Sequence, residues 1–282
     1  MNKHIEAPEI AKQHGMTRLV FEDDFESLDT IDLNGTGEAG YKWYIRRPYA
    51  APPLTAEDFT IEGSVLKLHE NNSKYNYGLA TVDGKNGVGY TFNKGVLEFR
   101  VRVPHYDQEM RSSNLPGGGG PAVWSFPREK IYEYPGNYAP QWVETDWMEY
   151  WGDLNLFPEG HYSITLHETV RAKENGVVQQ WENVQNHSLG SQRHQNGFHD
   201  ALWHTMTFLW DDDLLVGYYD DKEVLRMRYG EDRLCDPLPV VKTGDPHAKG
   251  AFSFMNRQEL ALIINGAKCN PMEIDWIRVW QK

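Results

Sequence analysis

Three carboxylates lie within six residues of one another, at Glu144, Asp146 and Glu149 in the stretch WVETDWMEYWG. Carboxylates this close repel one another when all are ionised, so the pKa of at least one must rise, and the aromatic rings around them add desolvation. One ionised and one protonated carboxyl group near neutral pH is the pair that glycoside hydrolysis requires. The stretch therefore predicts a pair of acidic catalytic groups.

The same stretch has the features of a β-strand, in which side chains alternate between two faces. Trp142, Glu144 and Asp146 then share one face, and Glu149 falls on the other by parity. One extra residue, a β-bulge at 147–148, would return Glu149 to the first face. The prediction is a row of three carboxylates on one face of a strand.

Aromatic residues bound this row. Trp151 joins it beyond the bulge and Trp142 stands at its start, so both are candidate platforms for sugar rings, whereas Val143, Thr145 and Tyr150 turn toward the core. A separation of about 5–5.5 Å between the two glutamates would indicate retention of configuration through a covalent intermediate. From the residues alone, a calcium site and a solvated acidic edge stay open as alternatives. Calcium usually takes oxygen ligands from several directions, and a solvated edge has no need of the tryptophans.

Composition narrows the class of protein. The chain has 282 residues, a formal net charge of −13 and 36 Phe, Trp and Tyr residues (11, 10 and 15). This length suits one large all-β domain or two smaller ones. The acidic balance argues against a nucleic-acid partner, which requires clustered Lys and Arg. No apolar run is long enough to span a membrane, and the first residues lack the apolar segment of a signal peptide.

Cysteine and metal-binding patterns are sparse. Cys235 and Cys269 could pair, but two cysteines make no disulfide framework. Neither a C-x-x-C nor an H-E-x-x-H pattern occurs, which argues against a dedicated transition-metal site.

The elements around the acidic stretch alternate in the same way. GVLEFRVRVP places Leu97, Phe99 and Val101 on one face, and HYSITLHETV separates apolar from polar residues likewise, with Ser163, Thr165 and His167 on the polar side. A hairpin with Gly63 in its turn is expected at FTIEGSVLKLHE, and two or three strands joined by Asp-rich turns at HTMTFLWDDDLLVGYYDDKEVLRMRY. A further strand is expected at MEIDWIRVWQK and a short helix over 5–14. Many short strands joined by turn signals predict an all-β sandwich or jelly roll. The glycine-rich segment 112–124 predicts a loop, either a simple connection or the rim of a cleft.

Six blocks of sequence, in order, resemble one enzyme family. ETDWMEYWG is similar to the E-x-D-x-x-E signature of the laminarinase-like branch of glycoside hydrolase family 16. FEDDF, KGVLEFRVRVP, PAVWSFP, WHTMTFLWDDDLLVGYYDDKEV and LALIINGAKCNPMEIDWIRVWQK resemble other strands of that family. The resemblance implies a single domain over 1–282, a β-jelly roll of two stacked antiparallel sheets with a concave substrate cleft.

The resemblance also implies an activity: a retaining endo-glycosidase acting on a β-linked polysaccharide, a β-1,3- or β-1,3-1,4-glucan. By motif position Glu144 would be the nucleophile and Glu149 the general acid/base. Asp146 would bond the nucleophile and modulate its charge. Catalysis would need no cofactor. The resemblance further implies a secreted or periplasmic enzyme, and we expect a monomer.

Other positions carry over from the family. Candidate substrate-binding residues besides Trp142 and Trp151 are Glu98, Arg100, Trp124 and Asn265. His167 joins them because its parity places it on the polar face, where it could touch a sugar or Asp146. For Glu98 and Arg100 a solvated ion pair is the alternative, for Trp124 a core position, and for Asn265 a turn. His204 we expect to be structural. A structural calcium ion would lie near Glu22 and Asp275.

The sequence departs from the family at places where substrate would lie. Gly120 stands where the family has a tryptophan, and APQW precedes the signature in place of the usual lead-in. The pair Arg46–Arg47 could meet a sulfate or carboxylate. These departures keep open a galactan substrate of the agar, porphyran or carrageenan type. A carbohydrate-binding jelly roll without catalysis is the other alternative, although both glutamates are present. The linkage, endo against exo attack and hydrolysis against transglycosylation stay undecided.

Overall fold

The computed structural model describes most of the chain, and everything below concerns the described residues. These are 5–46, 53–55, 57–68, 78–104, 121–131, 141–151, 161–174, 177–182, 192–195, 198, 200–228, 255–266 and 272–282. The glycine-rich segment up to Gly120, Arg47 and both cysteines lie outside them.

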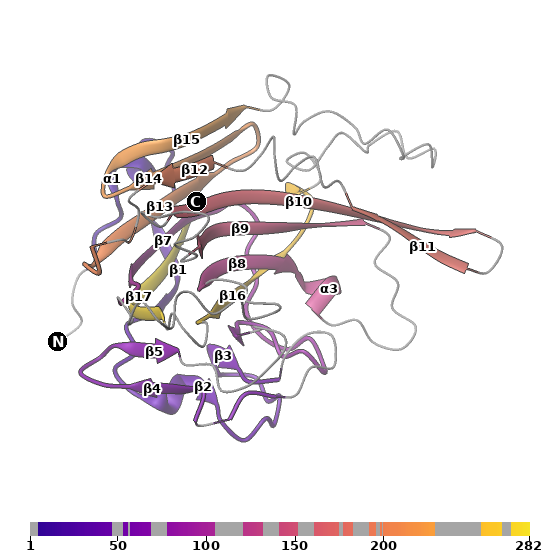
Figure 1. Ribbon diagram of the computed structural model, residues 1–282, viewed down its shortest axis with the longest axis horizontal. Coiled ribbons are helices and arrows are strands. Elements are labelled where there is room, and N and C mark those ends of the chain that lie inside the picture. The colour runs from indigo at the N-terminus through magenta and orange to yellow at the C-terminus, as the bar shows by residue number, and fades with distance from the viewer. Residues whose placement is uncertain are drawn as a thin grey trace.

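Two β-sheets make up the fold (Figure 1). The first, sheet A, has the order β15-β14-β13-β7-β17-β5-β4, and β1 also pairs with β17. Its strands are β1 (Arg18–Asp23), β4 (Phe59–Ile61), β5 (Leu66–Leu68), β7 (Gly95–Arg102), β13 (His204–Trp210), β14 (Leu214–Tyr219), β15 (Lys222–Arg228) and β17 (Met272–Gln281). All of its pairings are antiparallel.

The second, sheet B, has the order β11-β10-β9-β8-β16-β6-β3-β2, and β12 also pairs with β10. Its strands are β2 (Ile31–Asp32), β3 (Trp43–Tyr44), β6 (Leu79–Ala80), β8 (Ala122–Pro127), β9 (Gln141–Trp151), β10 (His161–Glu174), β11 (Val177–Glu182), β12 (Gln192–Gln195) and β16 (Leu260–Asn265). Only the short β2–β3 pair is parallel among the described strands. The acidic stretch is β9, and it lies between β8 and β10 with both edges paired (Figure 1).

The main core lies between the sheets. Leu97, Phe99 and Val101 of β7 belong to the same buried cluster as Trp147 and Tyr150 of β9. Full burial of a side chain of this size stabilises the fold by roughly 1.5–3 kcal/mol. The alternation seen in the sequence therefore fixes which face of each sheet points inward.

Each sheet also carries apolar residues on its outer face. On sheet A, Val96 and Trp280 pack against Ala11 of helix α1 (Glu9–Gln13), which lies within the helix expected over 5–14. On sheet B, Trp124 and Trp142 cluster with Ile131 of the short helix α3 (Arg128–Ile131). A 3-10 turn, η1, spans Leu28–Thr30. The predicted all-β sandwich is confirmed, with the expected hairpins at β4–β5 and β13–β14–β15.

Candidate active site

A β-bulge interrupts β9 at Trp147. Asp146 pairs with Trp124 of β8, yet Met148 pairs with Val123, the residue next to Trp124. Strand β9 therefore has one residue more than β8 over this interval, and its pairing with β10 shifts at the same place. The bulge predicted at 147–148 is confirmed.

The bulge sends two successive side chains inward. Trp147 and Met148 both belong to the core between the sheets, and Trp147 donates a hydrogen bond to the Ser125 hydroxyl at 2.7 Å. Because the extra residue resets the alternation, Glu149 lies on the outer face of sheet B with Glu144 and Asp146. The three carboxylates thus share one face, as the sequence predicted.

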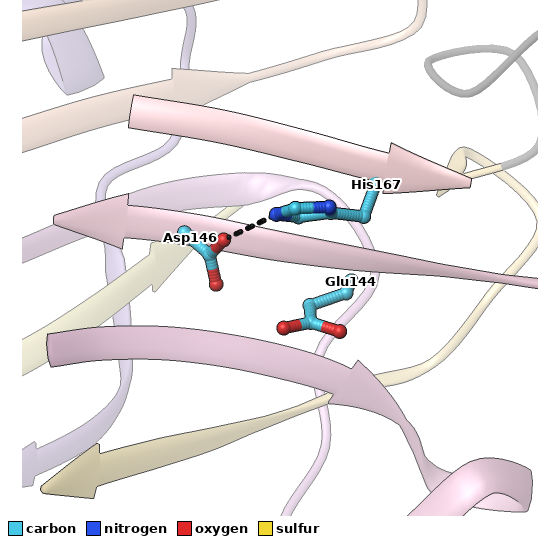
Figure 2. Close-up of side chains that lie close together, drawn as sticks. All are labelled: Glu144, Asp146 and His167. Carbon is cyan, nitrogen blue, oxygen red and sulfur yellow. Dashed lines mark ion pairs between the residues drawn. The ribbon is translucent and has the colours of Figure 1, made fainter. Parts of the chain in front are cut away.

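Strand β10 brings a histidine to these carboxylates. The residue opposite Glu144 is His167, and its Nε2 lies 3.0 Å from Oδ2 of Asp146. Figure 2 shows the side chains of Glu144, Asp146 and His167 directed toward one another from the adjacent strands β9 and β10. Asp146 and His167 are both buried, with 4% and 7% of their surface exposed. A buried carboxylate needs such a partner, because burying an unpaired charge is costly.

Burial and charge act together on Glu149. Desolvation, followed by the charge of Asp146, raises the pKa of Glu149 to about 8, and His167 opposes this shift. A carboxyl group with this pKa keeps its proton at neutral pH and can donate it. The acidic row therefore holds a proton donor.

The raised pKa predicts how stability depends on pH. Native Glu149 holds its proton up to about pH 8, whereas the unfolded chain releases it near the ordinary value of 4.5. Between these values the native state binds more protons, so the free energy of unfolding should fall as pH rises through this window. Urea unfolding of wild type and Glu149→Gln at pH 5, 7 and 8.5 checks this prediction. The substitution should reduce the pH dependence, and identical curves would contradict the assignment.

Trp124 and Asn265 lie beside the carboxylates. Trp124 pairs with Asp146, and its Nε1 donates to Oδ1 of Asn265 at 2.7 Å. Asn265 pairs with Ala122, which in turn pairs with Glu149. Paired residues point to the same face, so both candidates lie on the face of the acidic row. Their side chains are buried, with 5% and 4% exposed.

Trp142 also lies on this face but is covered. It is 3% exposed, and the Lys130 ammonium of α3 lies 4.1 Å from the centre of its ring. A cation at this distance interacts favourably with the face of an indole. The ring face that Lys130 covers is therefore not open for stacking on a sugar. The backbone of Trp151 continues β9, and its side chain lies outside the described residues.

The structure does not bring Glu98 and Arg100 to the acidic row. Both belong to β7 of sheet A, and the alternate residues Leu97 and Phe99 face the core, so their side chains point away from sheet B. Arg100 pairs with Asp275 at 2.6 Å, and burial raises the pKa of Glu98 to about 7. The expectation that they face the same cleft was wrong, because alternation identifies two faces of a strand but not which sheet carries the site.

The candidate calcium ligands are not gathered either. Asp275 is bound to Arg100, and Glu22 lies on β1, opposite Arg278. Within the described part of the chain, the one group of acidic, His or Cys side chains spaced for a metal ion is Glu144, Asp146 and His167, with one ligand atom of each within 4.8 Å of the others. Neither Glu22 nor Asp275 belongs to it.

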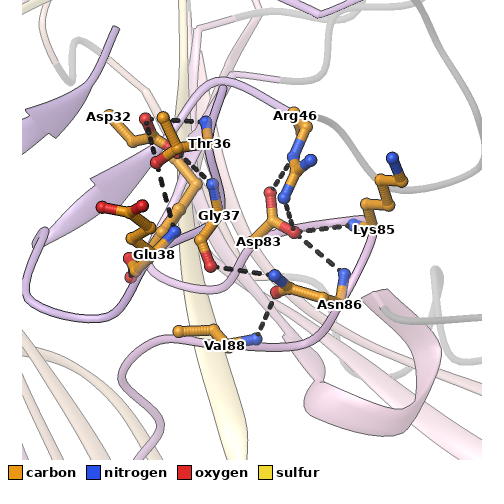
Figure 3. A network of polar contacts seen from close by, with 10 residues as sticks. Asp32, Thr36, Gly37, Glu38, Arg46, Asp83, Lys85, Asn86 and Val88 are labelled. Atoms are coloured by element: carbon orange, nitrogen blue, oxygen red, sulfur yellow. Dashed lines mark hydrogen bonds and ion pairs between the residues drawn. The ribbon is translucent and has the colours of Figure 1, made fainter. Parts of the chain in front are cut away.

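Arg46 has a structural partner. Its guanidinium forms two hydrogen bonds with the buried Asp83 carboxylate, one of them 2.7 Å long from Nη2 to Oδ2 (Figure 3). Asp83 also accepts from the backbone of Asn86, and the Asn86 amide donates to the carbonyl of Gly37. Gly37 has a φ of +70°, which favours glycine, and a Cβ there would push the Arg46 guanidinium out of its position. Arg46 is therefore committed to the loop network, and Arg47 lies outside the described residues.

His204 is structural, as expected. Its two ring nitrogens lie 2.6 Å from Asp220 and 2.9 Å from Asp200, and its ring stacks on Tyr219.

The polar face of β10 brings two more side chains to the acidic row that were not among the predicted site residues. Ser163 pairs with Glu149 and Thr165 with Asp146. The alternation in HYSITLHETV was the signal that could have found both.

Solved structures with the same fold are known. No protein-family profile matches the chain, and no curated sequence matches it. The laminarinase from Rhodothermus marinus is 17% identical over 94% of this chain and 97% of its own, with a TM-score of 0.52. SCLam, a non-specific endo-β-1,3(4)-glucanase from family GH16, is 16% identical over 94% and 95%, with a TM-score of 0.50.

A third structure, from work on endo-acting O-glycanases of human gut bacteria, is 16% identical over 93% of this chain and 90% of its own, with a TM-score of 0.50. None of the described helices is long and apolar enough to cross a membrane. Almost the whole chain thus shares the two-sheet fold of solved laminarinases and O-glycanases, which confirms at the level of fold the likeness to glycoside hydrolase family 16.

Proposed function

We propose that the chain is a retaining endo-glycosidase that hydrolyses a β-linked polysaccharide. The observation that carries this proposal is the bulge in β9, which places Glu144, Asp146 and Glu149 on one outer face of sheet B. A bulge re-aims a side chain at a cost in regular pairing, and such bulges occur next to active sites. Here it adds a protonated carboxyl group to a face that already holds two carboxylates.

In the first step the Glu144 carboxylate attacks the anomeric carbon. The bond between that carbon and the glycosidic oxygen breaks, and the oxygen takes the proton of Glu149. In the second step Glu149 removes a proton from water, which displaces Glu144 from the sugar with net retention. The charge of Asp146, which is bonded to His167, raises the pKa of Glu149 and so favours its protonated form.

The substrate we propose is a β-1,3- or β-1,3-1,4-glucan. The support is the likeness in fold to a laminarinase and to an endo-β-1,3(4)-glucanase that was crystallised with a mixed-linkage oligosaccharide. A galactan substrate has less support, because Arg46, which could have bound its sulfate or carboxylate groups, is paired with Asp83. Since one fold can serve several substrates, the likeness to O-glycanases adds mucin glycans to the polymers worth testing. Polysaccharides do not cross membranes unaided, so we propose that the enzyme acts outside the cell or in the periplasm. We further propose that it acts as a monomer.

The decisive experiment is reducing-sugar release from a panel of polymers. Laminarin, mixed-linkage glucan, agarose, porphyran, carrageenan and mucin glycans would be incubated with wild type and Glu144→Gln. Release from one polymer that the substitution abolishes supports both the class and the substrate. Retardation on a polysaccharide gel without any release would favour a binding module instead. The size of the first products separates endo attack from exo attack.

Divalent cations should not be needed for turnover, since every proposed step uses carboxyl groups and water. Dialysis against EDTA should therefore leave kcat and KM unchanged, and a loss restored by one metal would place an ion at Glu144, Asp146 and His167. The melting temperature reports separately on a structural calcium ion. A decrease in EDTA that calcium reverses would support the ion suggested by the family resemblance.

A further inference from the structure

Thr165 has a buried hydroxyl group that makes no hydrogen bond to any described residue. It lies near the middle of the β9–β10 pairing, and its side chain is 0% exposed. Its Oγ1 has no hydrogen-bond partner among the described residues. Buried hydroxyl groups in folded proteins nearly always have a hydrogen-bond partner, because a buried polar group without a hydrogen bond destabilises the fold. An exception beside the acidic row needs an explanation.

The position of Thr165 restricts what its hydroxyl can reach. Ile164 and Leu166 face the core, so Thr165 faces outward, directly opposite Asp146. Opposite side chains in an antiparallel pair have Cβ atoms about 4.5–5.5 Å apart. A threonine that changes between staggered χ1 rotamers can therefore bring its hydroxyl to the opposite carboxylate. Full burial argues against direct contact with a sugar.

Asp146 has room for a second donor. One of its oxygens lies 3.0 Å from His167 Nε2. An ionised carboxylate offers about four lone-pair sites on its two oxygens, and the bond from His167 takes one of them.

The need for a second donor changes during the reaction. In the free enzyme Glu149 is protonated at neutral pH. In the first proposed step its proton passes to the leaving oxygen, and Glu149 becomes a carboxylate next to the Asp146 carboxylate. Two like charges in a buried setting repel strongly. A hydroxyl group that donates a hydrogen bond to the Asp146 carboxylate at this step would stabilise the pair of adjacent negative charges.

We propose that Thr165 is a positioning residue whose hydroxyl donates to the Asp146 carboxylate as Glu149 loses its proton. The Thr165 hydroxyl keeps its own proton throughout. The bonds that change remain those of the proposed function, on which this inference rests: Glu144 to the anomeric carbon, that carbon to the leaving oxygen, and the proton from Glu149 to that oxygen. An interaction formed only in the transition state raises kcat and leaves KM nearly unchanged.

The test compares isosteric substitutions on one strand. Thr165→Val removes the hydroxyl and keeps the shape, and we expect kcat to fall about ten- to a hundredfold with KM within about twofold, as for the loss of one bond to a charged group. Thr165→Ser restores the hydroxyl and should restore kcat to within about threefold. Thr169→Val, four residues along the same face and opposite Trp142, serves as control and should leave kcat unchanged. Melting temperatures of all variants report on folding.

The leaving group gives a second readout, which a merely structural role would not change. A dinitrophenyl glycoside departs without a proton from Glu149, so Thr165→Val should slow its first step little or not at all. Equal kcat for Thr165→Val and wild type on the polymer would overturn this inference alone, and so would an equal loss on both substrates. Inactivity of wild type on every polymer would overturn the proposed function and this inference with it. If the valine variant does not fold, Thr165→Ala is measured in its place.

Discussion

Replacing Glu144 by glutamine should lower kcat on the polysaccharide by about 10⁴-fold or more, because the amide cannot form the covalent bond to the anomeric carbon. The side chain keeps its shape, and sugar binding should persist. Steady-state rates and affinity electrophoresis on the same polymer measure the two effects. A 2-fluoro glycoside with a good leaving group should label wild type at Glu144, which mass spectrometry of the peptide detects, and should not label the variant.

Glu98→Gln provides a matched control for this substitution. Glu98 is also a glutamate with a raised pKa, but it lies on sheet A and faces away from the acidic row. Its replacement should leave kcat within about twofold of wild type, because Glu98 lies on the other sheet and takes no part in the proposed steps. A Glu144→Gln variant with full activity would overturn the proposed role of Glu144. Equal losses in both variants would show that the activity tracks stability and not the site.

Replacing Glu149 by glutamine should have the second largest effect. Loss of a general acid lowers kcat on the polymer by roughly 10²–10⁴-fold. A dinitrophenyl glycoside needs no acid for the first step, so this step should stay fast while the glycosyl-enzyme accumulates. Stopped-flow release of dinitrophenol would show a burst followed by slow turnover.

Azide distinguishes this role from a general loss of function. A small anion can replace water in the second step without the help of a base, so azide should restore turnover of the dinitrophenyl glycoside by Glu149→Gln. NMR of the product should show a β-glycosyl azide, which is the retained configuration. An α-azide would contradict the double displacement. Unchanged steady-state turnover of the dinitrophenyl glycoside, with no burst and no effect of azide, would assign the acid/base role to another group.

The central feature of the site could be predicted from the sequence because it depends on local counting. Two residues separate Asp146 from Glu149, one more than strict alternation of two faces allows, and a bulge is the local way for a strand to absorb an extra residue. The alternation of β7 and β10 could be predicted for the same reason, and the sandwich follows from many such strands. Each inference needed only near neighbours along the chain.

The errors came from contacts between distant segments. The alternation in β7 separated Glu98 from the core residues correctly, but only the pairing order places β7 in sheet A and β9 in sheet B. The cover that Lys130 forms over Trp142, and the bond from Arg46 to Asp83, join segments without any shared periodicity. Patterns along a strand give faces, whereas the neighbours of a face depend on the whole topology.

The bulge in β9 also has a consequence for inheritance. Loss of one residue at 147–148 would leave Glu144 and Asp146 in place, turn Glu149 into the core and bring Tyr150 outward, since the side-chain period is two. Substitution at Trp147 or Met148 changes the core packing and, at Trp147, the bond to Ser125, but it leaves the two faces of the strand as they are. A deletion there exchanges the inner and outer faces for the rest of the strand. In this segment a change in length would therefore alter the site more than a change of residue type.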